Sequence, residues 1–92
     1  MRSYEILPNL KEILQKLFKK DKILYEQVIK KIDEIINSYD IEHYKNLRHD
    51  LKEFKRVQTG HFVLVFRFIE HENKVIFVDF DHHDRIYKKR FE

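Results

Sequence analysis

The stretch VDFDHHDRIY, residues 78–87, holds the densest group of chemically active side chains in the sequence. It contains three aspartates, two adjacent histidines, an arginine and a tyrosine, directly after a run of strand-forming residues. Carboxylates and imidazoles can bind a metal ion, and histidine with tyrosine can transfer protons while a phosphodiester is cut. The same residues can also form an ordinary polar strand end, so three interpretations compete.

A metal site is the first interpretation. Asp79 and Asp81 are two residues apart in a predicted strand, so their side chains share a side. The triplet Asp81-His82-His83 is similar to the signature of the DHH phosphoesterases, but those enzymes collect further aspartates from a much larger α/β domain. Neighbouring strand residues point to opposite faces, which separates His82 from His83. A short motif match is weak support, and we expect no metal site.

A structural role is the second interpretation. Asp79 can pair with Arg67 on the neighbouring strand, which is worth only ~0.2–1 kcal/mol at an exposed position. For any single residue this is the more common outcome. The cluster as a whole favours function, because basic residues are expected to gather beside it.

Metal-free cleavage of RNA is the third interpretation. The 2′-hydroxyl attacks the adjacent phosphate while a base removes its proton, an acid protonates the leaving 5′-oxygen, and cations stabilise the developing charge. Histidine suits proton transfer near neutral pH, and arginine holds phosphate oxygens in a bidentate manner. The candidates are Lys55 and Arg56 on one predicted strand, and His83, Arg85 and Tyr87 at the end of another.

Composition restricts the class of protein. The 92 residues predict one domain, 1–92, and 19 basic against 16 acidic residues leave a net charge of +3. That charge permits contact with phosphate but does not demand it. The absence of cysteine excludes a disulfide framework and a thiolate zinc site. No window reaches the ~18 apolar residues of a membrane span, and no signal peptide is evident, so we expect a cytoplasmic protein without a membrane partner.

Apolar spacing predicts an N-terminal strand and two helices. Residues 3–7 alternate as a short strand that Pro8 ends. From Leu10, apolar residues recur at i, i+3, i+4 and i+7, and a second run with this spacing covers residues 24–39. Asp21 is a suitable N-cap between them. The pattern predicts a helical hairpin with one shared apolar face.

The second half of the chain predicts a sheet. Residues 41–52 show neither the helical nor the strand period and are expected to form a basic loop. Strands are predicted at 54–58, 62–69 and 75–80, and the last residues are expected to add one helical turn. Their short connections favour antiparallel pairing. The expected fold is α+β: an N-terminal strand, an α-helical hairpin, then an antiparallel sheet, in the order β-α-α-β-β-β.

Strict alternation assigns side chains to the two faces of this sheet. In the last strand it places Ile76, Val78 and Phe80 on one face, and Phe77 with Asp79 and Asp81 on the other. The hairpin is expected to cover one face. The other face is expected to stay open and to present Arg67, the two aspartates and His83 to a substrate.

Two motifs in this order resemble the RelE/ParE toxin superfamily, and its RelE branch in particular. Residues 46–66, NLRHDLKEFKRVQTGHFVLVF, are similar to the family's leucine-rich segment, aromatic and basic strand, glycine and apolar strand. Residues 82–87, HHDRIY, look like its C-terminal HR-x-x-[IV]-Y. The resemblance covers nearly the whole chain.

The resemblance implies the toxin of a type II toxin–antitoxin pair, which cuts mRNA on the ribosome without a metal or other cofactor. The implied partners are an antitoxin protein, the ribosome and mRNA. Arg56, or Lys55, matches the family's phosphate-binding basic residue, His83 stands where many members have arginine, and Tyr87 matches the C-terminal tyrosine. The expected catalytic residues are therefore Arg56, His83 and Tyr87.

A wider basic path is expected to bind RNA. Its members are Lys55, Arg48, Lys52, His61 and Arg85, with His49 in the same loop as Arg48.

One departure from the family pattern keeps a second function open. Val63 stands where many RelE-like toxins have an arginine, and His61 is expected to compensate. The alternative is a non-catalytic binding module of the same fold, either a ParE-like topoisomerase inhibitor or a degenerate toxin that binds only antitoxin or RNA. Val63 favours the binding module, and the pair His83 and Tyr87 favours the nuclease.

Overall fold

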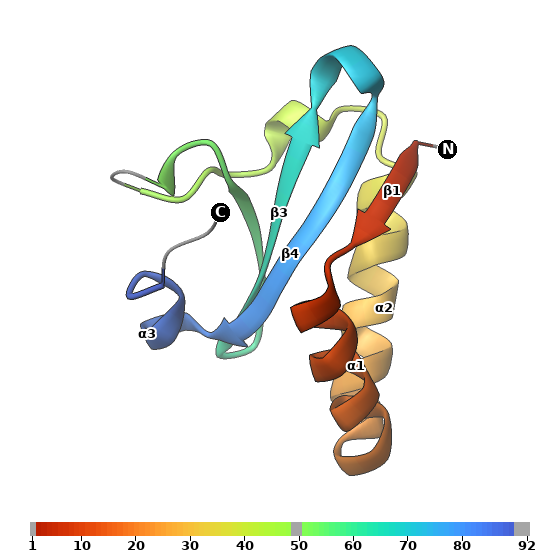
Figure 1. Cartoon of the computed structure of the whole chain (residues 1–92), viewed down its shortest axis with the longest axis vertical. Coiled ribbons are helices and arrows are strands. Elements are labelled where there is room, and N and C mark those ends of the chain that lie inside the picture. Colours follow the sequence, from red (N-terminus) through yellow and green to blue (C-terminus); the bar gives the residue numbers. More distant parts are fainter. Residues whose placement is uncertain (1, 49–50, 90–92) are drawn as a thin grey trace.

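The elements follow the predicted order β-α-α-β-β-β, with one short helix after the last strand (Figure 1). The computed structural model describes residues 2–48 and 51–89. The elements are β1 Ser3–Ile6, α1 Pro8–Lys20, α2 Lys22–Ile36, β2 Lys55–Thr59, β3 Phe62–Ile69, β4 Lys74–His82 and α3 His83–Ile86, with 3₁₀ turns at Ile41–His43 and Glu70–Glu72. The α+β fold is confirmed, while the end of the predicted C-terminal turn, residues 90–92, lies outside the described residues.

The helical hairpin begins and turns at residues that suit those positions. Pro8 opens α1, where its missing N–H costs nothing. The Asp21 N–H donates to the Leu17 carbonyl at 2.8 Å and closes α1. The Asp21 carboxylate then accepts a hydrogen bond from the Leu24 N–H at 3.2 Å, as an N-cap of α2 does. Among the described residues, no helix is long and apolar enough to span a membrane.

The four strands form one mixed sheet in the order β1-β4-β3-β2. β2, β3 and β4 pair antiparallel as predicted. β1 differs from the prediction of a purely antiparallel sheet, because it pairs parallel to β4 at the sheet edge. Parallel neighbours need a long crossover connection. The chain between β1 and β4 provides one through the helical hairpin, β2 and β3.

A β-bulge interrupts the pairing of β3 with β4. Val65 pairs with Asp79 and the next residue, Phe66, pairs with Phe77, so Val78 is the extra residue. The bulge changes which side chains of β4 share a face. Because residues paired across a sheet lie on the same face, Asp79 lies on the face of Val65, and Phe77 lies on the face of Phe66.

The predicted face assignment of β4 is therefore partly wrong. Phe77 and Phe80 both belong to the core under the helical hairpin, although alternation had placed them on opposite faces. Val78 and Ile76 pack on the other side. Strict alternation holds only while every residue has a partner, and the extra residue of the bulge breaks it.

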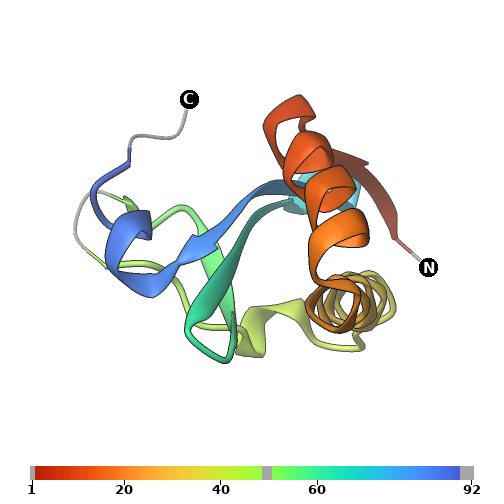
Figure 2. The ribbon, with the colours of Figure 1, turned by 90° about the horizontal axis from the view of Figure 1, so that it is seen from below.

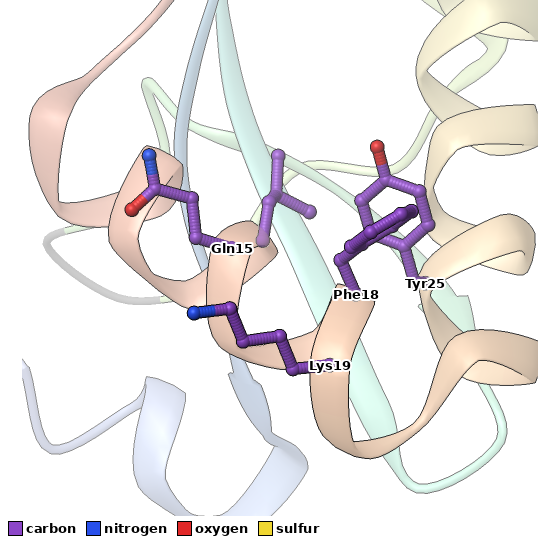
Figure 3. A pocket seen from close by; sticks show the side chains of 5 residues that line it. Gln15, Phe18, Lys19 and Tyr25 are labelled. Atoms are coloured by element: carbon purple, nitrogen blue, oxygen red, sulfur yellow. The ribbon is translucent and has the colours of Figure 1, made fainter.

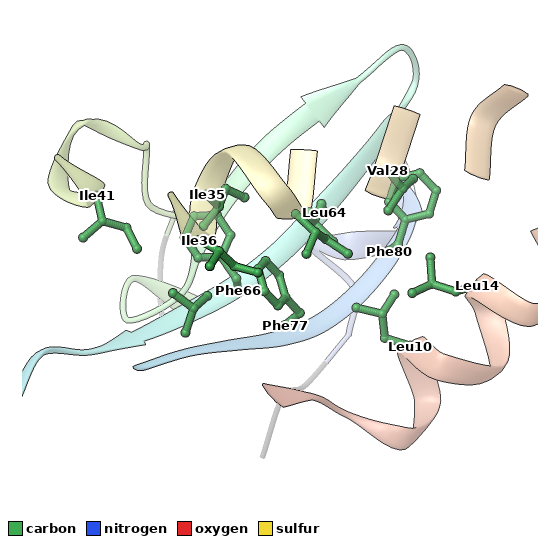
Figure 4. Close-up of a cluster of buried hydrophobic side chains, with 12 residues drawn as sticks. Leu10, Leu14, Val28, Ile35, Ile36, Ile41, Leu64, Phe66, Phe77 and Phe80 are labelled. Atoms are coloured by element: carbon green, nitrogen blue, oxygen red, sulfur yellow. The ribbon is translucent and has the colours of Figure 1, made fainter. Parts of the chain in front are cut away.

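The main core lies between the helical hairpin and the sheet (Figures 1 and 2). Figure 4 shows how side chains from α1, α2, β3 and β4 meet there. Its buried members are Leu10, Leu14, Val28, Ile32, Ile35, Ile36, Ile41, Leu64, Phe66, Val75, Phe77 and Phe80. Most of the amphipathic stripes predicted for the two helices are confirmed as core, but Ile29 and Tyr39 of the second stripe are exposed.

The opposite face of the sheet is not open, which corrects the prediction of a free charged surface. A second core covers much of it, and its buried members are Leu47, Phe54, Val63, Val65, Val78 and Ile86. The loop before β2 and the helix α3 supply the covering side chains, and Figure 2 shows α3 on the side of the sheet away from the hairpin. Asp79 is only 2% exposed beneath this layer.

We expect Phe77→Ala to lower the free energy of unfolding by about 3–5 kcal/mol, because it removes a fully buried ring and leaves a cavity. Urea denaturation followed by circular dichroism measures this change. The control is Tyr39→Ala, since the Tyr39 side chain is fully exposed at 103% and its loss should change stability by no more than about 0.5 kcal/mol. Equal effects of the two substitutions would contradict the described core.

Candidate active site

Four side chains predicted to act on RNA line one small pocket. The pocket has a volume of about 220 Å³ and is lined by Arg48, Arg56, His83 and Tyr87. The three residues predicted to be catalytic are thus brought together, with one predicted RNA-binding residue beside them. A small-molecule site typically occupies about 300–1,000 Å³, so this pocket suits one group of a larger ligand, such as a phosphodiester.

The pocket forms where separate parts of the chain meet beside the second core. Arg48 comes from the loop before β2, and Arg56 is the second residue of β2. His83 is the first residue of α3, and Tyr87 follows its last residue. His83 and Tyr87 are four residues apart, and one helical turn therefore places them as neighbours. Their ring centroids lie 5.9 Å apart in an edge-on arrangement.

Local contacts orient the turn that carries His83 and Tyr87. The His83 N–H donates to the His61 carbonyl at 2.8 Å, which fixes the start of α3 to the β2–β3 turn. The Asp84 N–H donates to the Nδ1 of His82 at 3.3 Å, so His82 caps the helix. Ile86 is fully buried in the second core, and Tyr87 packs against that core. These contacts turn the two candidate groups toward β2.

Arg56 carries an unused donor at the pocket. Its Nε is buried and has no hydrogen-bond partner among the described residues. Its backbone N–H donates to the Lys45 carbonyl at 2.8 Å, which holds the residue in place. A guanidinium group in a pocket wall can hold an anionic ligand through charge-assisted hydrogen bonds. With Arg48 on the same pocket, two guanidinium groups favour a phosphate there.

Lys55, which the sequence predicts to bind RNA, does not line the pocket, and its side chain is buried. Its side chain is on the opposite face of β2 from Arg56, because strand residues alternate. It is 7% exposed, and its Nζ donates to the Tyr44 carbonyl at 3.3 Å and to Asn46 Oδ1 at 3.0 Å. The Glu42 carboxylate lies 3.6 Å from the same nitrogen. Lys55 therefore anchors the loop before β2 from inside the protein.

The other predicted RNA-binding residues do not line the pocket. The ring of His61 stacks on the ring of His82, with centroids 6.1 Å apart. Arg85 is exposed and lies 3.7 Å from Asp81. Lys52 is exposed on the loop before β2, and His49 lies outside the described residues.

The carboxylates of β4 hold a lysine of the C-terminal segment. Lys89 Nζ lies 2.7 Å from Asp79 Oδ2 and 2.7 Å from Asp81 Oδ2. Asn9 at the start of α1 also donates to Asp79, at 3.3 Å. The predicted pairing of Asp79 with Arg67 is therefore wrong, because Arg67 instead stacks over the Phe54 ring at 5.7 Å. The sequence held one signal for Lys89: a carboxylate in a buried strand requires a nearby cation.

Ion pairing changes the pKa of both ends of this contact. Burial by itself raises the pKa of Asp81. Hydrogen bonds from Lys89 and the His82 N–H outweigh this effect, together with the charges of Lys89 and Arg85. The pKa of Asp81 therefore lies below 3.8. Burial likewise lowers the pKa of Lys89, but its bonds to Asp79 and Asp81 outweigh that effect and raise the pKa above 10.5. Within the described residues no group of three or more His, Cys, Asp or Glu side chains could hold a metal ion.

A larger pocket lies on the helical hairpin, away from these groups. It measures about 380 Å³ and is lined by Leu14, Gln15, Phe18, Lys19 and Tyr25 (Figure 3). Its walls are mainly apolar. Its lining residues do not combine a phosphate-binding cation with two side chains that could accept and donate protons. The smaller pocket is therefore the candidate active site, because its side chains are of the types that bind phosphate and transfer protons.

Comparison with known proteins finds relatives that are similar in sequence over nearly the whole chain. A Methanocaldococcus jannaschii protein described as "Putative toxin RelE4" is 54% identical over 91 residues, which cover 98% of this chain and 95% of that protein. No family model matches the chain.

Solved structures show the same fold at low sequence identity. The toxin–antitoxin complex RelBE2 of Mycobacterium tuberculosis matches with a TM-score of 0.72 and 17% identity, over 89% of this chain and 98% of that one. The isolated RelE toxin of E. coli matches with a TM-score of 0.70 and 18% identity, over 89% and 84% of the two chains. At these identities the likeness concerns the fold alone.

We expect Asp81 to contribute to stability in a pH-dependent way. Its pKa in the folded protein lies below its ordinary value of 3.8, so its stabilising effect is present above that value and is lost as the pH falls through the folded pKa. Asp81→Asn should therefore flatten the dependence of the unfolding free energy on pH between about pH 5 and pH 2. Urea titrations across this range measure it. The exposed Glu53→Gln serves as control, and the same flattening in both variants would contradict the assignment.

Proposed function

The chain belongs to the RelE family of toxins, and we propose that it inhibits translation by cutting mRNA on the ribosome without a metal ion. The observation that supports this proposal is the convergence of Arg56, Arg48, His83 and Tyr87 on one pocket. Two permanent cations beside two groups that can exchange protons are the components that metal-free phosphodiester cleavage requires. We place the protein in the cytoplasm, with the ribosome and mRNA as its targets and an antitoxin as its protein partner.

The proposed reaction assigns one proton transfer to each side chain. His83 takes the proton of the 2′-hydroxyl, the 2′-oxygen forms a bond to phosphorus, and the bond from phosphorus to the 5′-oxygen breaks. The Tyr87 hydroxyl gives its proton to that 5′-oxygen. The products are a 2′,3′-cyclic phosphate and a 5′-hydroxyl.

The arginines have the task of holding the phosphate while its charge grows. The Arg56 side chain lines the pocket and supplies a guanidinium group for a phosphate oxygen. Arg48 supplies a second guanidinium from the loop before β2. Removal of one such donor typically slows a reaction about 10²–10³-fold. The second guanidinium matters because Val63 stands where the family resemblance leads one to expect an arginine.

Val63 supports a second candidate function. Its side chain is 1% exposed and packs within the second core, so it offers nothing to a phosphate. A protein that lacks this cation would be a weaker nuclease or only a binding module, such as a topoisomerase inhibitor or a toxin that binds antitoxin or RNA. Arg48 favours the nuclease, because it restores a second cation to the pocket.

The partner assignment rests on the relatives. The M. tuberculosis structure with this fold is a toxin–antitoxin complex. We propose that an antitoxin binds this chain and blocks its toxicity, through an amphipathic helix laid on its surface or a strand added to the sheet.

We expect His83→Asn and Tyr87→Phe each to reduce the rate of mRNA cleavage about 10²–10⁴-fold, because each removes one proton transfer. Arg56→Gln should reduce it about 10²–10³-fold. The measurement maps mRNA ends in a cell-free translation extract with and without ribosomes, and identifies the cyclic phosphate at the new 3′ ends.

Matched controls come from the exposed surface. His71→Asn and Tyr39→Phe make the same changes at exposed positions outside the pocket, and both should cleave like wild type. Stalled translation without cuts, caused by folded protein, would contradict the nuclease and favour the binding module. Cuts that persist in His83→Asn and Tyr87→Phe would move the chemistry away from this pocket.

A further inference from the structure

A three-residue ionic contact closes the segment that carries the candidate catalytic groups. Lys89 Nζ lies 2.7 Å from the carboxylates of both Asp79 and Asp81. The two aspartates belong to β4, and Lys89 follows α3. His83 and Tyr87 lie between Asp81 and Lys89 in the chain. We name the contact of Asp79, Asp81 and Lys89 the Lys89 clamp.

The segment cannot hold its own shape. α3 has four residues, and a helix this short is unstable without tertiary contacts. At its start, the His83 N–H is fixed to His61. In its middle, Ile86 is buried in the second core. Beyond Tyr87, the backbone N–H groups of Lys88 and Lys89 donate to the carbonyls of Arg85 and Ile86 at 3.1 and 3.2 Å, which closes the turn on itself. The Lys89 clamp is the side-chain contact that ties this end of the turn to β4.

The clamp is itself anchored in the rigid part of the molecule. Asp79 is 2% exposed, and its Oδ1 accepts hydrogen bonds from the Phe80 N–H at 2.8 Å and from Asn9 of α1 at 3.3 Å. Its position is therefore set by β4 and by the helical hairpin. Through Asp79, Lys89 ties the C-terminal segment to the main body of the protein.

We propose that Lys89 is a positioning residue for the active site, which holds Tyr87 against His83 by clamping the chain end to Asp79 and Asp81. This inference rests on the proposed nuclease function. Lys89 does not line the pocket, so it acts through the placement of the turn and not on the substrate. A misplacement of about 1 Å in a catalytic group can cost about 10²-fold in rate.

Charge explains why a cation is required at this position. Asp79 and Asp81 point to the same face of β4, where two carboxylates repel each other. Among residues 2–48 and 51–89, the charged groups that face them are Lys89 from the C-terminal segment and Arg85 from α3, while α1 contributes the neutral Asn9. Arg85 is 74% exposed and reaches only Asp81, at 3.7 Å, so it cannot replace Lys89. The raised pKa of Lys89 agrees with this pairing.

The test compares two adjacent lysines. Lys89→Met removes the clamp, and Lys88→Met makes the same change at the exposed neighbour. We expect Lys89→Met to lower kcat for cleavage of ribosome-bound mRNA at least 10-fold with KM for the mRNA–ribosome complex within about 2-fold, since the arginines that bind phosphate are unchanged. Lys88→Met should retain wild-type kcat. Lys89→Arg should recover most of the activity, because a guanidinium can bridge both carboxylates.

A second measurement reports the position of the turn without any activity. Nuclear Overhauser contacts between the rings of His83 and Tyr87 should be present in wild type, Lys88→Met and Lys89→Arg, and should weaken or vanish in Lys89→Met. Circular dichroism and urea denaturation at a temperature well below unfolding confirm that each variant is folded. If Lys89→Met unfolds, Asp79→Asn combined with Asp81→Asn tests the same clamp without a buried unpaired charge.

The two measurements separate failure of this inference from failure of the proposed function. A wild-type protein that does not cleave mRNA would overturn the nuclease, and the ring contacts would still decide whether Lys89 positions Tyr87. Folded Lys89→Met with intact ring contacts and wild-type kcat would overturn the role of Lys89. An equal loss in Lys88→Met would also overturn it, because a general effect of positive charge would then account for the result.

Discussion

The antiparallel pairing of β3 with β4 is the interaction on which the rest of the structure depends. These two strands occupy the centre of the sheet and supply buried side chains to both of its faces. On one face they support the helical hairpin, and on the other they support the loop before β2 and the short helix α3. A chain of 92 residues has little interior, and burying both faces of one sheet lets it cover more of its apolar residues. Each functional feature lies at an edge of this double-sided arrangement.

The bulge in that pairing determines where the charged residues of β4 point. Because Val78 is the extra residue, Phe77 and Phe80 both reach the main core, and Asp79 lies on the face of α3. A strand with strict alternation could not place Phe77 and Phe80 in one core. The bulge thus combines an apolar side for the hairpin with a carboxylate side for the C-terminal segment. Bulges often redirect side chains near functional sites, and this one provides the anchor for Lys89.

The candidate active site shows how a small protein can gather polar side chains in a pocket without a deep cleft. The second core brings the loop before β2 next to α3, and their polar residues meet at its border. Buried apolar contacts hold the backbone, while the pocket beside them is lined by two arginines, a histidine and a tyrosine. The larger apolar pocket on the hairpin has more volume but lacks these groups. Volume alone therefore does not identify the site of chemistry in this fold.

The sequence by itself determined the order of elements and the residues that gather at the pocket. Amphipathic spacing, the Asp21 cap and runs of β-branched residues act over a few neighbours, so they could be recognised without tertiary information. The motifs around Arg56, His83 and Tyr87 were recognised through their resemblance to the RelE/ParE superfamily, and the structure brings those three side chains together. Their roles in catalysis remain a proposal.

Only the tertiary structure decided the features that depend on distant partners. The parallel pairing of β1, the bulge at Val78 and the covered second face follow from how strands and layers fit together. The choice of Lys89 as the partner of Asp79 and the burial of Lys55 follow in the same way. Each results from contacts between residues far apart in the chain or in separate elements, where many pairings satisfy the same local pattern. The free energy of burying apolar surface and pairing charges selects one of them, and that selection belongs to the whole fold.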